Sequence, residues 1–534
     1  MAETPSKFRS AFNKWTSSRW FPLSLAGLGF ILPLIEPFIL LLAGNSIANS
    51  LWPHAVRSLS WSFTLREYSL LIFLCSIALT TTILLLLKHE PLTWVKNTAI
   101  FSSGSIIGMI LVFMLLDIAY LRGAFLLLPT LYGIILFNLL AIAGGIPKIP
   151  QRGSELSSKI NRSLHIIGVL IAVWLVIPGL TAFAGLSPTP PEAPSSGYGS
   201  SPGPYDTQTT IFPYPMPDEV EDIRGTYEED IEFSIHLTVP KDVNLTDLPL
   251  AIIVHGFGNP FFETYVDWIE HLAAKGMVVA FIQYPSDVWP DGADDYELVE
   301  KDGMSNHPFH LPRNIAIDSA LQYLETILES HNVDPSHLII GGHSLGAGYA
   351  LVIMDKVLQI GWGSETLFID LETPYARPVQ DHLQVNTSAI PGHMMAHIVV
   401  SEDDMSVNDC FGVHHQLLLN EVEGGEVLFM QAPSDRYGFP RLVATHYLQA
   451  SQTHDSLADW AFYRRVDAQA DWVVSRSIGD TIAEENAYLS LIDSAELRYM
   501  GKWSDGTPVK EMSVYSDAIN DSEFEYCKDW VGPD

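Results

Sequence analysis

Five long apolar runs dominate the first third of this sequence and constrain its fold more than any other feature. They cover roughly residues 20–44, 68–87, 97–121, 123–146 and 165–186. Each can cross the ~30 Å hydrocarbon core of a bilayer, which takes about 20 helical residues. Because backbone polar groups in lipid must be paired within the segment, such runs form helices. We therefore expect residues 1–186 to be a five-helix transmembrane region in an integral membrane protein of the cell membrane.

Lysine and arginine are distributed unequally between the alternate loops that join these runs. Ten lie in the N-terminal segment and in the loops after the second and fourth runs, and three lie in the other two loops. Cytoplasmic loops carry the excess of basic residues. The bias predicts a cytoplasmic N-terminus. With five spans, the rest of the chain is then extracytoplasmic.

The charge changes sign along the chain. Residues 1–186 hold 13 Lys and Arg against 6 Asp and Glu, whereas residues 187–534 hold 16 against 56. A surface this acidic repels nucleic acid, so we expect no nucleic-acid partner. Between the two parts, residues 187–206 are rich in Pro, Ser and Gly and lack apolar periodicity, which is typical of a linker. We therefore expect a separate domain over residues 207–534.

Strand and helix patterns alternate in this second domain. Buried or alternating strands are expected at 230–239, 248–255, 277–284, 337–341, 365–371, 395–400 and 426–431, and helices at 262–274, 312–330 and 345–359. Such an alternation predicts an α/β fold with a mostly parallel sheet and helices on both faces.

One serine stands out in this pattern. Ser344 lies in the stretch Gly342-His343-Ser344-Leu345-Gly346, between a buried strand and a helix. The G-x-S-x-G spacing at such a turn is typical of a nucleophile elbow, in which the turn lifts the serine Oγ above the sheet.

The earlier stretch His255-Gly256-Phe257-Gly258 also follows a buried strand. Together with the G-H-S-L-G sequence and a late acid and histidine, it resembles the α/β-hydrolase superfamily over roughly residues 207–470. The resemblance is to lipases and esterases, and more narrowly to dienelactone hydrolase-like and cutinase-like esterases. It implies an oxyanion hole formed by the backbone N–H groups of Phe257 and Leu345.

The same resemblance implies a triad in the order serine, acid, histidine. The acid follows a late strand, where Asp404 fits the spacing best, with Asp403 and Asp370 as alternatives. The histidine follows the last strand, where His446 comes first and His454 is the alternative. We predict no metal ion and no cofactor, because no ligand spacing supports a metal site.

These features favour a membrane-anchored serine hydrolase, most consistent with a carboxylic ester hydrolase acting on small-molecule or lipid esters. The alternative is a membrane transport or sensor protein whose hydrolase-like domain binds a ligand without catalysis. Cys410 and Cys527 either form a disulfide in an oxidising compartment or remain two free thiols; the sequence leaves both open.

Overall fold

A computed structural model describes residues 20–42, 50–51, 93–116, 188–221, 233–241, 247–286, 307–331, 333–375, 385–404, 406–438 and 441–529. The chain divides into two compact units. Unit 1 comprises Met1–Thr189 with Tyr437–Arg441, and unit 2 comprises Pro190–Arg436 with Leu442–Asp534.

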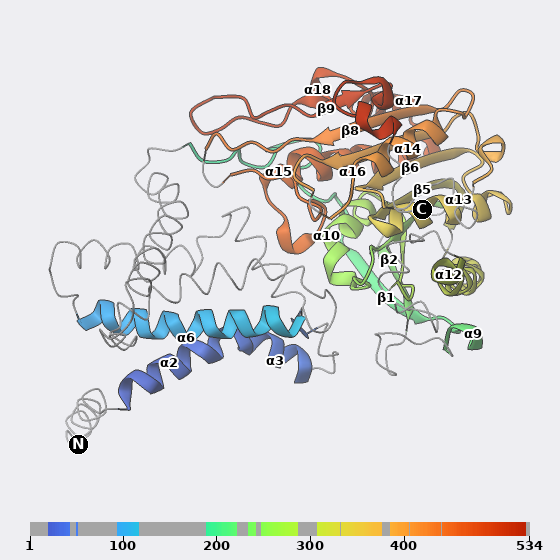
Figure 1. Ribbon diagram of the computed structural model, residues 1–534. Coiled ribbons are helices and arrows are strands. Elements are labelled where there is room, and N and C mark those ends of the chain that lie inside the picture. Colours follow the sequence, from blue (N-terminus) through green and yellow to red (C-terminus); the bar gives the residue numbers. More distant parts are fainter. Residues whose placement is uncertain are drawn as a thin grey trace, which may run out of the picture. The chain divides into compact units, whose positions relative to one another are not determined.

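The described part of unit 1 is helical. Helix α2 (Phe21–Ile31), the 3₁₀ turn η1 (Leu32–Leu34) and α3 (Ile35–Leu42) follow one another, and α6 (Thr93–Leu116) lies beside α2 (Figure 1). The backbones of the two helices approach closely at Gly104 of α6. A Cβ added at this glycine would lie 2.0 Å from the carbonyl oxygen of Ala26. Small residues that let helix backbones meet are typical of helix pairs in membranes.

One of the five predicted spans is supported by length and composition. Among the described residues, Phe21–Leu42 is the one segment long and apolar enough to cross a membrane. The third predicted span coincides in part with α6, whose apolar stretch, Lys96–Val112, is shorter than a span. The other three predicted spans lie outside the described residues. The structure thus supports one candidate span where the sequence predicts five.

The described part of unit 2 contains a nine-stranded sheet with the order β1-β2-β4-β3-β5-β6-β7-β8-β9. Its strands are β1 (Thr207–Pro213), β2 (Ser234–Pro240), β3 (Leu248–Val254), β4 (Val278–Ile282), β5 (Val333–His343), β6 (Thr366–Glu372), β7 (Met395–Ser401), β8 (Glu426–Ala432) and β9 (Ser513–Tyr515). The six strands from β4 to β8 in this order are parallel, and β1, β2 and β9 are antiparallel to their neighbours.

Helices cover both faces of this sheet and define two apolar cores (Figure 1). Helices α12 (His307–Leu328), α13 (Leu345–Leu358) and α14 (Cys410–Leu419) contribute to one core, and α10 (Phe262–Ala273) and α16 (Arg464–Ile478) contribute to the other. Successive residues of β3 point into opposite cores, because side chains alternate along a strand. This explains why the central strands are apolar throughout instead of alternating.

The predicted α/β class and mostly parallel sheet are confirmed. All seven predicted strands and three predicted helices are present, with ends shifted by up to about five residues. The sequence patterns missed the two edge strands β1 and β9 and the helices α14, α16 and α17 (Thr481–Leu489). Edge strands have little apolar surface to bury: β1 is largely exposed and β9 is three residues long.

The predicted linker differs from a free spacer, since residues 190–206 belong to unit 2 and pack along it. The buried N–H of Gly199 donates to Asp467 at 2.7 Å, and the indole N–H of Trp460 donates to the carbonyl of Glu192 at 3.0 Å. The N–H of Tyr205 donates to the carbonyl of Ala274 at 3.1 Å. The composition of residues 190–206 predicts an open segment. Their backbone groups find hydrogen-bond partners only in the folded domain, so the composition does not reveal these contacts.

Cys410 and Cys527 form a disulfide across 117 residues, which settles the question that the sequence left open. Cys410 begins α14, and Cys527 lies in the 3₁₀ helix η7 (Glu525–Lys528). The bond therefore ties the C-terminal segment to the helix that follows β7.

Removing this bond should destabilise unit 2. A cross-link over so long a loop reduces the entropy of the unfolded chain, and the loss of a native disulfide costs about 2–5 kcal/mol. We expect Cys410→Ser/Cys527→Ser to lower the free energy of unfolding by that amount in denaturant titrations. Reductant should lower the stability of the wild type to the same level and leave the variant unchanged. Equal stability of the variant and the oxidised wild type would contradict the prediction.

Candidate active site

Ser344 occupies the sharp turn between β5 and α13. Its backbone has φ 55° and ψ −124°, and it is one of three non-glycine residues with positive φ in the described part of the chain. A residue with a Cβ in such a conformation costs about 1–3 kcal/mol and persists only where the surrounding structure enforces it. This geometry is that of a nucleophile elbow.

The two glycines of the G-x-S-x-G sequence are required by close packing. A Cβ on Gly342 would lie 2.3 Å from the carbonyl oxygen of Gly346, and a Cβ on Gly346 would lie 2.3 Å from that of His255. Neither position can hold a side chain. The turn therefore closes tightly on itself and on the end of β3.

The two residues whose N–H groups are predicted to bind an oxyanion belong to the two segments that meet at this contact. Leu345 is the first residue of α13, where N–H groups have no acceptor within the helix and the helix dipole favours negative charge. Phe257 lies between Gly256, whose N–H donates to the Tyr265 hydroxyl at 3.0 Å, and Gly258, whose N–H donates to Ser286 Oγ at 2.8 Å. The loop is thus held on both sides of Phe257.

His255 fixes the start of the same loop. Its Nε2 accepts from the N–H of Tyr284 at 3.0 Å, so its Nδ1 carries the proton and donates to the carbonyl of Gly256 at 2.8 Å. Burial lowers the pKa of His255 to about 3, so the ring is neutral. His255 therefore serves a structural role, because both of its ring nitrogens hold main-chain groups.

His446 and Asp404 form a buried pair. The ring Nδ1 of His446 lies 2.7 Å from Asp404 Oδ2, and the two side chains are 8% and 3% exposed. Asp404 Oδ1 accepts from the N–H groups of Ser406 and Val407 at 2.7 and 3.0 Å, which orients the carboxylate. Because a carboxylate only accepts, Nδ1 is the donor and Nε2 is left to accept a proton.

The fold brings this pair to the elbow. Asp404 follows β7 and His446 follows β8, and both leave the sheet at the carboxyl edge where β5 ends. The ring centroids of His446 and His343, the residue before Ser344, are 4.6 Å apart. Ser344, Asp404 and His446 therefore gather at one edge of the sheet.

The alternative acids have other partners. Asp403 forms a partly exposed ion pair with Arg436, with 2.5 Å between Oδ2 and Nη2. Asp370 points from the middle of β6 into a buried cluster, where its Oδ1 lies 3.2 Å from Arg465 Nη1 and Glu372 pairs with the same guanidinium. Burial raises the pKa of both Asp370 and Glu372. Neither Asp403 nor Asp370 is paired with His446.

His454, the alternative histidine, is held between two carboxylates. Its Nδ1 lies 2.7 Å from Asp267 and its Nε2 lies 2.5 Å from Asp459. Burial lowers the pKa of His454, but hydrogen bonds and attraction to the two carboxylates outweigh it and raise that pKa to about 9. Both ring nitrogens donate, so His454 is a cation at neutral pH and has no lone pair to act as a base.

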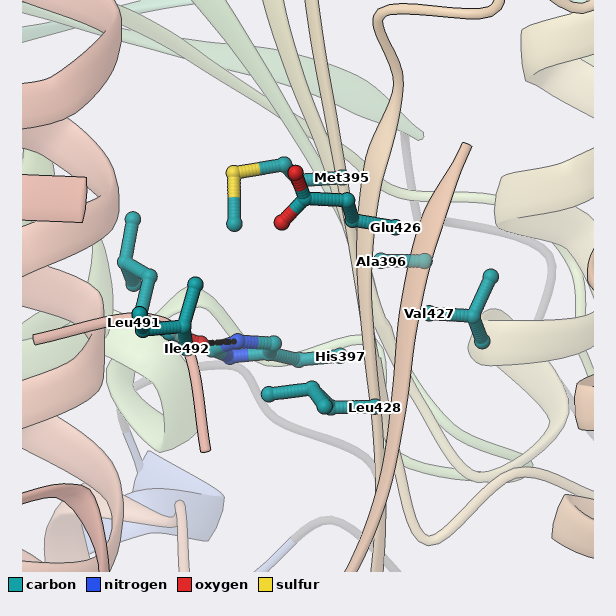
Figure 2. A pocket seen from close by; sticks show the side chains of 8 residues that line it. All are labelled: Met395, Ala396, His397, Glu426, Val427, Leu428, Leu491 and Ile492. Atoms are coloured by element: carbon teal, nitrogen blue, oxygen red, sulfur yellow. Dashed lines mark hydrogen bonds between the residues drawn. The ribbon is translucent and has the colours of Figure 1, made fainter. Parts of the chain in front are cut away.

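A pocket of about 230 Å³ lies at the other edge of the sheet, near the first residues of β7 and β8. Figure 2 shows Met395, His397, Glu426 and Leu428 pointing toward Leu491 and Ile492. His397 Nε2 lies 2.9 Å from the carbonyl oxygen of Leu491. The pocket is separate from Ser344, which lies beyond the opposite ends of the parallel strands. Within the ranges given above, no group of three or more His, Cys, Asp or Glu side chains is arranged to hold a metal ion.

The strand order, the strained serine after β5, and the acid and histidine after β7 and β8 define unit 2 as an α/β-hydrolase fold. The predicted α/β-hydrolase fold is thereby confirmed. The narrower dienelactone hydrolase-like or cutinase-like placement stays a prediction.

Solved esterases are similar in fold at low identity. They include a thermostable esterase from Pseudomonas putida ECU1011 (15% identity, TM-score 0.34, covering 51% of this chain and 85% of that chain). An esterase from Rhizomucor miehei has 14% identity, TM-score 0.34 and coverage of 53% and 86%. Carboxyl esterase 2 from Tuber melanosporum has 16% identity and a TM-score of 0.33, and the match covers 51% of this chain and 87% of that chain. No family model and no curated protein matches the chain. These similarities support no activity, and the fold follows from the strands and the turn described above.

The ion pairs of His454 make the stability of unit 2 depend on pH. A pKa raised to about 9 from 6.5 contributes about 3 kcal/mol, fully present below pH 6.5 and lost as pH rises through 9. We expect the difference in unfolding free energy between wild type and His454→Ala to shrink by about that amount between pH 6 and pH 9.5. Chemical denaturation at several pH values measures this difference in unfolding free energy. A difference that does not depend on pH would show that the ion pairs of His454 do not stabilise unit 2.

Proposed function

We propose that this chain is a membrane-anchored serine hydrolase that cleaves carboxylic esters outside the cytoplasm. In this proposal Ser344 is the nucleophile, His446 the general base and Asp404 the residue that orients His446. The N–H groups of Leu345 and Phe257 stabilise the oxyanion. The substrate is a small-molecule or lipid ester, and the lipase- and esterase-like form of the G-H-S-L-G sequence favours an ester over an amide.

The proposed reaction follows the acyl-enzyme route. His446 Nε2 takes the proton of Ser344 Oγ as this oxygen attacks the ester carbonyl. The tetrahedral oxyanion forms beside the N-terminus of α13. The C–O bond to the alcohol then breaks, and the alcohol leaves with the proton from His446. Water, deprotonated by His446, attacks the acyl-enzyme and releases the acid and Ser344.

One observation carries the proposal: His446 donates from Nδ1 to a buried, oriented Asp404 beside a serine in a strained turn. Burial of the carboxylate and its two backbone donors fix the tautomer that a general base needs. A binding domain without catalysis has no need of this tautomer or of a strained serine.

The location of the domain has independent support. The apolar helix Phe21–Leu42 favours an anchor in the membrane, and the basic residues of the sequence favour a cytoplasmic N-terminus. The disulfide Cys410–Cys527 favours an oxidising compartment for the acidic domain, because reducing cytosol keeps thiols free.

The triad is tested by three substitutions in the full-length protein. We expect Ser344→Ala to remove labelling by a fluorophosphonate, which requires an activated serine. His446→Ala and Asp404→Asn should each lower turnover of a chromogenic ester by about 10³-fold or more, because base and orienting acid act as a unit.

His454→Ala is the matched control, since it removes a half-buried histidine that is paired with aspartates and lies outside the proposed triad. Its turnover should stay within about tenfold of wild type, or ~1.4 kcal/mol in barrier. Circular dichroism confirms folding of each variant. An inactive His454→Ala with an active His446→Ala would move the base to His454, and a labelled Ser344→Ala would refute the nucleophile.

The topology is tested by a membrane-impermeant amine reagent added to intact cells. We expect it to modify lysines of unit 2, such as Lys502 and Lys510, which mass spectrometry identifies after digestion. Modification that appears only after the membrane is permeabilised would place the domain in the cytoplasm.

A further inference from the structure

His343, the residue before Ser344, is hydrogen-bonded through both ring nitrogens. Its Nδ1 lies 2.9 Å from the hydroxyl of Tyr265, and its Nε2 lies 2.9 Å from the main-chain carbonyl oxygen of His446. The ring is 2% exposed and Tyr265 is fully buried, so water does not replace either contact.

The direction of each hydrogen bond follows from its end groups. The N–H of Gly256 can only donate, so it donates to the Tyr265 oxygen, at 3.0 Å. The tyrosine proton is then donated to His343 Nδ1. The carbonyl of His446 can only accept, so the N–H proton of the His343 ring is on Nε2. The four groups form one continuous chain: Gly256 N–H to Tyr265 O–H to His343 Nδ1, and His343 Nε2–H to the His446 carbonyl.

This series of hydrogen bonds joins three segments that are far apart in sequence. Gly256 belongs to the loop after β3 that carries Phe257, His343 belongs to the elbow, and His446 belongs to the loop after β8. The segments also touch: a Cβ on Gly256 would lie 3.2 Å from both His343 Nδ1 and the Cβ of Ser344. The backbone that presents the oxyanion donor and the backbone that carries the base are therefore fastened to the same imidazole.

We propose that Tyr265 and His343 are positioning residues that hold the Phe257 loop and the His446 backbone at fixed distances from Ser344. This inference rests on the proposed function of Ser344. The two residues touch no substrate. They act by keeping the oxyanion donors and the base in place before substrate binds, which is where preorganised sites gain their rate.

His343 itself does not serve as a second base. Burial and the adjacent His446 hold the pKa of His343 well below its usual range, so the ring stays neutral. Its Nδ1 lone pair is occupied by Tyr265 and its Nε2 proton by the His446 carbonyl. The imidazole is thus a rigid two-ended link, with an acceptor at one end and a donor at the other.

Tyr265→Phe in the full-length protein breaks this link by removing one oxygen atom. The ring and its packing against Phe281, 5.5 Å away between centroids, are retained. We expect kcat for a chromogenic ester to fall about 10²-fold with KM changed less than about threefold, because small misplacement of catalytic groups affects the transition state more than binding.

Tyr214→Phe is the matched control. Tyr214 is a buried tyrosine whose hydroxyl donates to a main-chain carbonyl, that of Gln283, at 2.6 Å. The Tyr214→Phe variant should lose about as much unfolding free energy as Tyr265→Phe and retain the wild-type kcat. Equal losses of kcat in the two variants would overturn the proposal, since they would trace the effect to a lost buried hydroxyl in general.

Three further variants test the link at His343. His343→Gln offers one acceptor and one donor and should retain at least about tenfold more kcat than His343→Leu, which offers neither. Adding Tyr265→Phe to His343→Leu should lower kcat by less than about a further twofold, because the series of hydrogen bonds is already broken in His343→Leu. Additive losses, or a Gln variant no better than Leu, would overturn the positioning role.

Fluorophosphonate labelling separates failure of this proposal from failure of the proposed function. If Ser344→Ala abolishes labelling and Tyr265→Phe turns over ester like wild type, the positioning role is wrong and the serine hydrolase stands. If Ser344→Ala is still labelled, the proposed function is wrong, and the positioning role, which depends on it, falls as well.

Discussion

The close contact between the β5–α13 turn and the end of β3 is the constraint on which the rest of the site depends. Gly346 leaves no room for a Cβ against His255, and Gly342 leaves none against Gly346. The turn can close only with glycine at both positions, and closing it forces Ser344 into its positive φ. Strain at one residue is thus maintained by packing that involves two neighbouring strands and a helix.

Three histidines of unit 2 show how environment assigns chemical state. His343 is kept neutral by burial and binds through both nitrogens. His454 is kept charged by two carboxylates, and its raised pKa makes it an ion-pair partner. His446 has one carboxylate on Nδ1, which leaves the other nitrogen to accept a proton. The difference lies in how many carboxylates each ring meets, since the side chain is the same.

Covalent and noncovalent ties secure both ends of the acidic domain. Residues 190–206 are fastened near the N-terminal end by Asp467 and Trp460, and the disulfide fastens the C-terminal segment to α14. Asp404 lies six residues before Cys410, so the disulfide also restrains the region that presents the proposed acid.

The sequence by itself determined the elements whose signal is local. Apolar runs predicted the central strands, and the G-x-S-x-G spacing predicted the elbow at Ser344, because period and turn chemistry are written in consecutive residues. It could rank Asp404 above its alternatives only by spacing after the strand, and His446 above His454 only by order along the chain. Tertiary structure decided what depends on distant partners: the carboxylates that enclose His454, the Cys410–Cys527 pairing and the docking of residues 190–206. Tyr265 gave no signal at all, since on α10 it reads as one more apolar position. Its hydroxyl meets His343 across 78 residues, and only the folded chain places them together.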